Sequence, residues 1–185
     1  MPGMTPVLGI RYPCSGDTID SSVFANFTND IQAALLTGDA AVASAANRPA
    51  AQVQGETPTQ SVVINTATVM TYTTEVFDND DMADIAVNND RLTIVTGGLY
   101  LCGAQVTTLT GFATISSMTV NLTVNGTTVY RYKTPGFGFG SAQINRVPLD
   151  LNAGDILRAE TRWTGTGGPA NLSYRELTAE MIASH

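Results

Sequence analysis

From residue 61 onward the chain alternates short runs of β-forming residues with strong turn signals, and this pattern constrains the fold more than any other. The segment 118–133, MTVNLTVNGTTVYRYK, is the clearest example. Its Val120, Leu122 and Val124 alternate with polar residues ahead of an Asn-Gly pair, which favours the positive φ angles of a tight hairpin. Short strands with regular turns and no helix between them predict an antiparallel sandwich or jelly roll. The expected strands are 62–72, 84–87, 91–96, 99–109, 117–124, 128–133, 143–151, 155–164 and 171–182.

One of these runs, GLYLCGAQV at 98–106, is apolar on both faces. Leu99 and Leu101 point to one side of the expected strand. Tyr100, Cys102 and Ala104 point to the other. A strand of an antiparallel sandwich normally exposes one face to water, so the second apolar face needs a cover, either another subunit or a loop or helix of the same chain. We expect these five residues to form a core strand or a subunit interface, with Cys102 buried and unpaired.

The residues before 61 divide into two further parts. Three prolines and three glycines in residues 1–18 indicate an extended arm. After it, apolar residues recur at helical spacing and predict a short amphipathic helix, which needs a partner on the β domain, on another copy or on another protein. We therefore divide the chain into an arm and anchor helix (1–48), a Pro-containing linker (49–60) and a head domain (61–185). The apolar stripe of the helix consists of Phe24, Phe27, Ile31 and Leu35.

Charge and composition exclude several partners. The formal net charge is -7 and only 14% of residues are charged, so no polybasic run is present to neutralise nucleic-acid phosphates or an anionic membrane. No run approaches the ~20 apolar residues of a membrane span. The N-terminus lacks the basic start and apolar run of a signal peptide. These features predict synthesis in the cytoplasm, no membrane insertion and no nucleic-acid partner.

The order of signals in residues 61–183 resembles the globular head family shared by complement recognition subunits, short-chain collagens and tumour-necrosis-factor ligands. NDRLTIVTGGLYLCGAQV is similar to that family's apolar pair, its glycine, its tyrosine two residues later and its inner strand. VNLTVNGTTV is similar to its hairpin, and VPLDLNAGDILRAE to its strand, Gly-Asp turn and strand. The resemblance implies a ten-strand antiparallel jelly roll. It also implies a homotrimer, with residues 99–104 as candidates for the trimer interface.

The N-terminal segment carries a second resemblance. GIRYPCSGDTIDSSVFANFTNDIQAAL followed by NRPAAQV resembles the opening of small virion proteins of tailed bacteriophages, in which an RYP arm precedes a short helix and a linker. The two halves together imply an anchor carrying a trimeric knob, as in phage head fibres, capsid decorations and minor tail proteins.

Catalysis finds little support in the sequence. The only histidine is His185 at the last position, and neither a Gly-x-Ser-x-Gly motif nor a P-loop is present. We expect no enzyme and no cofactor.

An acidic stretch at 75–90 is the one candidate for metal chemistry. The preferred interpretation of this stretch is a solvated loop, followed by a weak calcium site and then by catalytic carboxylates. The candidate residues are Asp78, Asp80, Asp81 and Asp84. The spacing does not fit an EF-hand.

Aromatic residues beside glycines are candidates for ligand contact. Phe137 and Phe139 alternate with glycines in TPGFGFGSA, and Trp163 precedes TGTGGP. The alternatives are phenylalanines folded onto the core and a tryptophan that anchors it.

The hypothesis from the sequence is a non-enzymatic structural protein of a bacteriophage virion. It would be a homotrimer docked on other virion proteins of capsid or tail through its N-terminal region. Its head would lie on the virion surface, for decoration or for contact with a host cell-surface carbohydrate or protein. The alternative is a soluble bacterial module that binds a carbohydrate or a protein.

Overall fold

The computed structural model describes residues 3–4, 11–12, 48–108, 115–135 and 140–184. The chain divides into two compact units, Met1–Asn47 and Arg48–His185. In the first unit, β1 (Gly3–Met4) pairs antiparallel with β2 (Arg11–Tyr12). The expected anchor helix lies outside the described residues.

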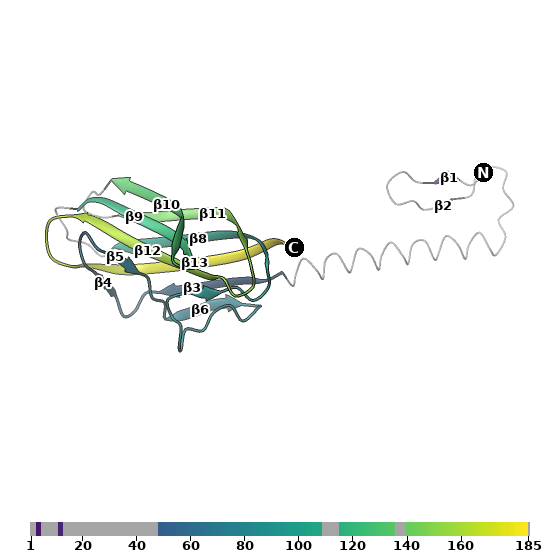
Figure 1. Cartoon of the computed structure of the whole chain (residues 1–185), viewed down its shortest axis with the longest axis horizontal. Coiled ribbons are helices and arrows are strands. Elements are labelled where there is room, and N and C mark those ends of the chain that lie inside the picture. Colours follow the sequence, from purple (N-terminus) through teal and green to yellow (C-terminus); the bar gives the residue numbers. More distant parts are fainter. Residues whose placement is uncertain (1–2, 5–10, 13–47, 109–114, 136–139, 185) are drawn as a thin grey trace. The chain divides into compact units, whose positions relative to one another are not determined.

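The second unit is a sandwich of two antiparallel sheets (Figure 1). One sheet has the order β11-β8-β13-β3-β6, with β4 also pairing with β13, and the other has the order β10-β9-β12-β5, with β7 also pairing with β12. Strands that are distant in sequence thus lie side by side, and the expected all-β jelly roll is confirmed, with eleven strands in the described residues of this unit instead of ten. The six-stranded sheet comprises β3 (Ala50–Gly55), β4 (Gln60–Val62), β6 (Thr74–Asp78), β8 (Gly98–Thr108), β11 (Ser141–Leu151) and β13 (Ala170–Ser184). The five-stranded sheet comprises β5 (Ala67–Val69), β7 (Leu92–Thr93), β9 (Ile115–Val124), β10 (Thr127–Pro135) and β12 (Ile156–Gly165).

The pleat of β8 directs successive side chains to opposite faces of the sheet. Tyr100, Cys102 and Ala104 point into the core between the sheets, where they are almost completely buried. Leu99 and Leu101 lie on the opposite, outward face and are half-buried. Both faces of this strand therefore carry apolar side chains in the folded chain, as the sequence indicates.

The predicted linker at 49–60 is wrong, because most of it belongs to the sandwich. Residues 50–55 form β3, which pairs with β13 on one side and β6 on the other. Ala51 and Val53 alternate with polar residues and are fully buried. The flanking Pro49 and the terminal Gly55 resemble linker residues, but they lie at the ends of the strand, where neither interrupts the ladder.

Two strand assignments near the acidic stretch also differ from expectation. Residues 85–87 form a turn, so the strand predicted at 84–87 is wrong. The chain instead places β6 at 74–78, an edge strand in which the adjacent Val76 and Phe77 are both exposed. Because these apolar residues do not alternate with polar ones, the period-two pattern of a half-buried strand is missing there.

The hairpin between β9 and β10 confirms the interpretation of the Asn-Gly pair. Asn125 has a φ of 51° and Gly126 a φ of 79°, as a two-residue turn of this kind requires. The Asn125 side chain donates to Asp155 Oδ1 at 2.7 Å and accepts from the Ile156 backbone N–H at 2.9 Å. The turn is therefore joined to the start of β12. Among the described residues, no helix has the length and apolarity that crossing a membrane requires.

Candidate functional site

The outward face of the six-stranded sheet is a candidate interaction surface, which we call the β8 face. It is centred on Leu99 and Leu101 of β8, whose side chains keep part of their area accessible. Leu101 is flanked in register by Pro148 of β11 and Glu180 of β13. At Gly103 an added Cβ would lie 2.9 Å from Thr178 Oγ1, so the neighbouring strands approach closely there. The face combines apolar, small and polar groups, as protein interfaces do.

A second candidate surface lies on the edge strand of the other sheet. Tyr130 and Tyr132 of β10 are 44% and 43% exposed, although their partners across the ladder, Leu122 and Val120, are fully buried. We call these two tyrosines the β10 edge. Tyrosine combines a large apolar ring with a hydroxyl group and is enriched at protein interfaces for that reason.

Two ionisable side chains, those of Cys102 and Tyr100, lie in the core beneath the β8 face. Cys102 is a free, fully buried thiol, as expected from the sequence, and burial raises its pKa to about 12. The Tyr100 hydroxyl donates to the Thr96 carbonyl oxygen at 2.6 Å. Its pKa is also raised to about 12, first by burial and then by the charge of Asp80. Both groups are therefore protonated at neutral pH and act as packing elements.

Arg175 of β13 is a buried charge that the sequence pattern gives no reason to expect. It is 1% exposed, and it donates from Nε to the Thr71 carbonyl at 2.7 Å and from Nη2 to the Pro58 carbonyl at 3.3 Å. Burial lowers its pKa, against a smaller opposing effect of Tyr72. Burial also raises the pKa of Tyr72, which the positive charge of Arg175 partly offsets. This cluster ties β13 to the loops that precede β4 and follow β5.

The acidic stretch forms an ordered loop whose carboxylates bond to its own backbone. Asp78 accepts hydrogen bonds from the backbone N–H groups of Asp80 at 3.1 Å and Ala83 at 2.6 Å. Asp84 accepts one from the backbone N–H of Val87 at 3.1 Å. Across the part of the chain that the structure describes, no three His, Cys, Asp or Glu side chains come together as a metal site. Asp78 and Asp84 thus have structural partners within the loop.

Asp90, at the far end of the same stretch, joins two strands. It accepts from Arg91 Nε at 2.6 Å and from Arg158 Nε at 2.9 Å. Partial burial alone would raise the pKa of this carboxyl, but the hydrogen bonds and charges of Arg91 and Arg158 hold it below its usual value of 3.8. The arrangement is an ion-pair network that fixes the start of β7 to β12.

The aromatic ligand-contact candidates have different outcomes. Trp163 is fully buried in the core and donates its indole N–H to Thr161 Oγ1 at 2.8 Å. Its proposed role in ligand contact is therefore wrong, and its role as a core anchor is confirmed. Phe137 and Phe139 lie outside the described residues, as do the anchor-helix residues Phe24, Phe27, Ile31 and Leu35.

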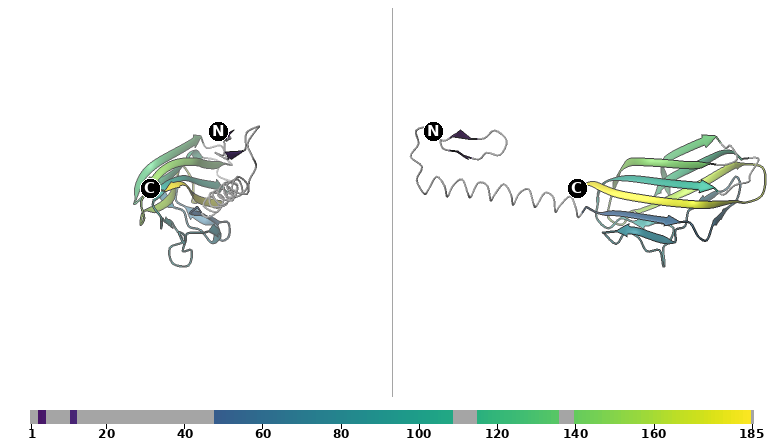
Figure 2. Two further views of the ribbon diagram at one scale, coloured as in Figure 1. Left: turned by 90° about the vertical axis from the view of Figure 1, so that its right-hand side faces the viewer. Right: turned by 180° about the vertical axis from the view of Figure 1, so that it is seen from behind.

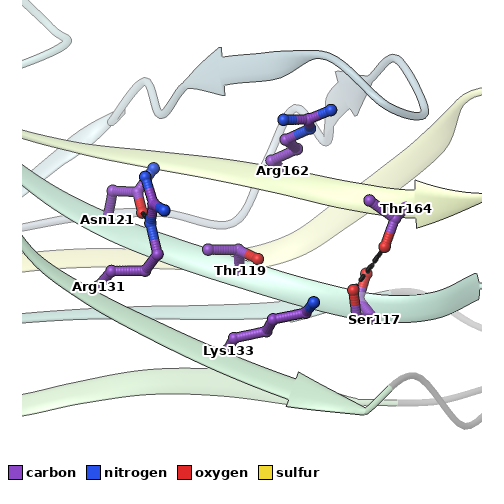
Figure 3. A pocket seen from close by; sticks show the side chains of 7 residues that line it. All are labelled: Ser117, Thr119, Asn121, Arg131, Lys133, Arg162 and Thr164. Carbon is purple, nitrogen blue, oxygen red and sulfur yellow. Dashed lines mark hydrogen bonds between the residues drawn. The ribbon is translucent and has the colours of Figure 1, made fainter.

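A polar pocket of about 260 Å³ opens on the outward face of the five-stranded sheet (Figure 3). Arg131 Nε donates to Asn121 Oδ1 at 2.9 Å, and Ser117 and Thr164 share a hydrogen bond between their hydroxyls. Sequence analysis missed this pocket, because its residues come from three strands and only the register brings them together. We call it the cationic pocket; its lining residues are Ser117, Thr119, Asn121, Arg131, Lys133, Arg162 and Thr164.

Comparison with known proteins identifies the fold. No protein-family model matches the sequence, and no curated protein sequence is significantly similar to it. Among solved structures, the globular domain of zebrafish complement 1qA aligns over 75% of this chain and 100% of its own, with a TM-score of 0.55 and 15% identity. Eiger TNF from S. frugiperda aligns over 75% of this chain and 95% of its own (TM-score 0.51, 16% identity), and murine APRIL over 71% and 98% (TM-score 0.51, 16% identity). The sandwich therefore has the jelly-roll fold of complement and tumour-necrosis-factor heads.

Proposed function

We propose that the chain is a non-enzymatic structural protein that works as a homotrimer, with the jelly roll as its exposed head. The observation that carries this proposal is the outward pair Leu99 and Leu101, whose apolar side chains point away from the core and keep part of their area accessible within one protomer. Burial of such a face against another copy removes apolar area from water.

The position of the two candidate surfaces favours a ring over a two-fold dimer. The β8 face belongs to the six-stranded sheet and the β10 edge to the other sheet, so they are different parts of one protomer. A two-fold interface uses one self-complementary patch on both subunits, whereas contact between two different patches propagates head to tail and closes as a ring. The resemblance noted above implies that the ring contains three subunits.

Light scattering on the full chain and on residues 48–185 tests the assembly. We expect three times the monomer mass for both, since the interface lies in the second unit. Leu101→Glu should give monomers, because it places a carboxylate in the contact, and Tyr132→Ser should weaken the assembly from the other side. Val87→Glu is the control, because Val87 is 78% exposed in a turn that contributes to neither surface. A monomeric full chain would refute the proposal.

We infer further that the trimer is a component of a bacteriophage virion, docked on capsid or tail proteins through residues 1–48. Support for this placement comes from the resemblance of the N-terminal segment to small virion proteins. The test is mass spectrometry of purified particles from the phage that encodes the chain. Detection in stoichiometric amounts is expected, and recovery only from the soluble lysate would favour a free binding module instead.

The free binding module remains the alternative function because one observation favours it. The cationic pocket lies on an outward sheet face with its cations exposed, as a binding site for a soluble ligand requires. The full chain binding a saccharide while absent from particles would support this alternative.

A further inference from the structure

The three cations of the cationic pocket are brought together by the register of three strands. Lys133 of β10 pairs with Thr119 of β9, which pairs in turn with Arg162 of β12, so these residues lie on one rung of the sheet. Arg131 lies two residues before Lys133 on the same face. With strands about 4.8 Å apart and about 3.3 Å per residue, the Cα atoms of Lys133 and Arg162 are roughly 10 Å apart, and those of Arg131 and Lys133 roughly 7 Å.

These cations lack the carboxylate partner that three other arginines of the sandwich have. Arg91 and Arg158 pair with Asp90, and Arg146 pairs with Glu180 at 2.9 Å. Arg175 is buried against backbone carbonyls. Among the described residues, Arg131, Lys133 and Arg162 form no ion pair, although the whole chain carries sixteen carboxylate side chains against nine lysines and arginines.

One carboxylate on this face is that of Glu160, which is a neighbour of Asn121 in register and lies two residues from Arg162 along β12. It forms no ion pair with the described cations and does not line the pocket. Uncompensated cations on a charge-poor, acidic protein attract an anion from solution. The pocket is thus a local exception to the overall negative charge.

The rest of the lining indicates the kind of anion. Ser117, Thr119, Asn121 and Thr164 present hydroxyl and amide groups that can donate to and accept from sugar hydroxyls. The lining contains no aromatic ring on which a nucleic-acid base could stack. The three cations come from separate positions on two strands around a pocket of about 260 Å³, so an extended ligand with several negative groups can reach all of them.

We propose that the cationic pocket binds an acidic polysaccharide, whose sulfate or carboxylate groups pair with Arg131, Lys133 and Arg162 while its hydroxyls bond to the polar lining. Each of the three cations then meets a separate negative group, and the neutral residues between them contact the sugar ring. The pocket belongs to a single protomer and faces away from the β8 face. The proposal therefore goes beyond the assembly described above and does not depend on it.

Calorimetric titration of the full chain with dextran sulfate and with polygalacturonate tests the proposal. At least one of them should bind, with an affinity that falls as salt is added, and neutral dextran should not. The double variant Lys133→Gln/Arg162→Gln should weaken binding about tenfold or more, because two charge-assisted contacts are removed. Both side chains are exposed, so the variant should retain the wild-type melting temperature and mass by light scattering.

Two control variants separate this pocket from general charge effects. Arg48→Gln changes the charge of an exposed arginine outside the pocket and should leave the affinity within about twofold of wild type. Thr119→Val keeps all the charges and removes a lining hydroxyl, so it should weaken binding to the polysaccharide but not to inorganic sulfate.

Several outcomes would overturn the assignment. They include equal loss in the double variant and in Arg48→Gln, unchanged binding in the double variant, and no binding to either acidic polysaccharide. Inorganic sulfate that binds as tightly as dextran sulfate would show that the sugar chain contributes nothing. Single-stranded DNA that binds as tightly as the polysaccharides would assign the pocket to phosphates instead.

Discussion

The buried guanidinium of Arg175 makes Gly55 a position where one methyl group should be costly. In the register of β13 and β3, Arg175 lies directly opposite Gly55. A Cβ added at Gly55 would lie 2.3 Å from Arg175 Nη2 and 2.8 Å from Cζ and Nε. A surface arginine would move aside, but this one is enclosed and hydrogen-bonded. Gly55→Ala must therefore displace the guanidinium from the carbonyls of Thr71 and Pro58.

The magnitude follows from those two bonds. A hydrogen bond from a charged donor contributes about 1.5–3 kcal/mol, and the 3.3 Å bond to Pro58 is at the weak end. We expect Gly55→Ala to reduce the free energy of unfolding by about 2–4 kcal/mol, a large part of the roughly 5–15 kcal/mol of a typical domain. The measurement is urea unfolding with the slope fitted for each variant, so that a change in stability is separated from a change in the unfolded state.

A double-mutant cycle identifies the cause of the loss. In the Arg175→Met background the guanidinium is absent, so the added methyl should cost no more than about 1 kcal/mol and the two substitutions should couple by roughly 2 kcal/mol. Gly168→Ala is the matched control, because nothing lies within 4 Å of its Cβ position and it should change stability by less than about 0.5 kcal/mol. An equal cost of Gly55→Ala in both backgrounds would refute the reasoning.

Three further predictions concern the core and the ion pairs. Trp163→Ala should destabilise the sandwich by about 3–5 kcal/mol in denaturant unfolding, because it leaves a cavity and removes the hydrogen bond to Thr161 Oγ1, and a loss below 1 kcal/mol would contradict its burial. Because the folded-state pKa of Asp90 is lowered, its contribution to stability should be complete above pH 3.8 and be lost as pH falls through the folded pKa; Asp90→Asn should flatten this acid limb of a melting-temperature profile. The Cys102 thiol should not react with a disulfide reagent at pH 8 in the native protein and should react fully in denaturant, since its pKa is about 12; rapid native reaction would show that the core is open.

The sequence predicted those features that local chemistry decides. Asn125 and Gly126 specify their turn by backbone preference alone, and the apolar run around Cys102 has to be buried wherever it lies. Strand β3 was missed because Pro49 and Gly55 are turn-forming in isolation, whereas pairing with β13 and β6 makes them strand ends. The local signal was overridden by partners that are about 25 and 125 residues away in the sequence.

The functional surfaces depend on register, which no local pattern contains. Lys133 and Arg162 become neighbours only because each pairs with Thr119 of the strand between them. The outward row of polar residues on β9 is visible as simple alternation, but the cations beside it come from two separate strands. Whether Trp163 is buried or exposed likewise depends on which face of β12 points into the core. Fold class was therefore accessible from the sequence, and the pocket was not.

The chain enters and leaves the sandwich at the same end (Figure 2), and this has a practical consequence for labelling. Ala50 pairs with Glu180, and the Met181 backbone N–H donates to the Pro49 carbonyl at 2.8 Å. The loop that precedes β13 lies at the opposite end of that fifteen-residue strand, about 50 Å away at 3.3 Å per residue. A peptide epitope inserted at Gly168 would therefore lie at the end of the sandwich opposite to Arg48 and Ser184, whereas a tag joined to the last strand would lie at the end where the sandwich begins.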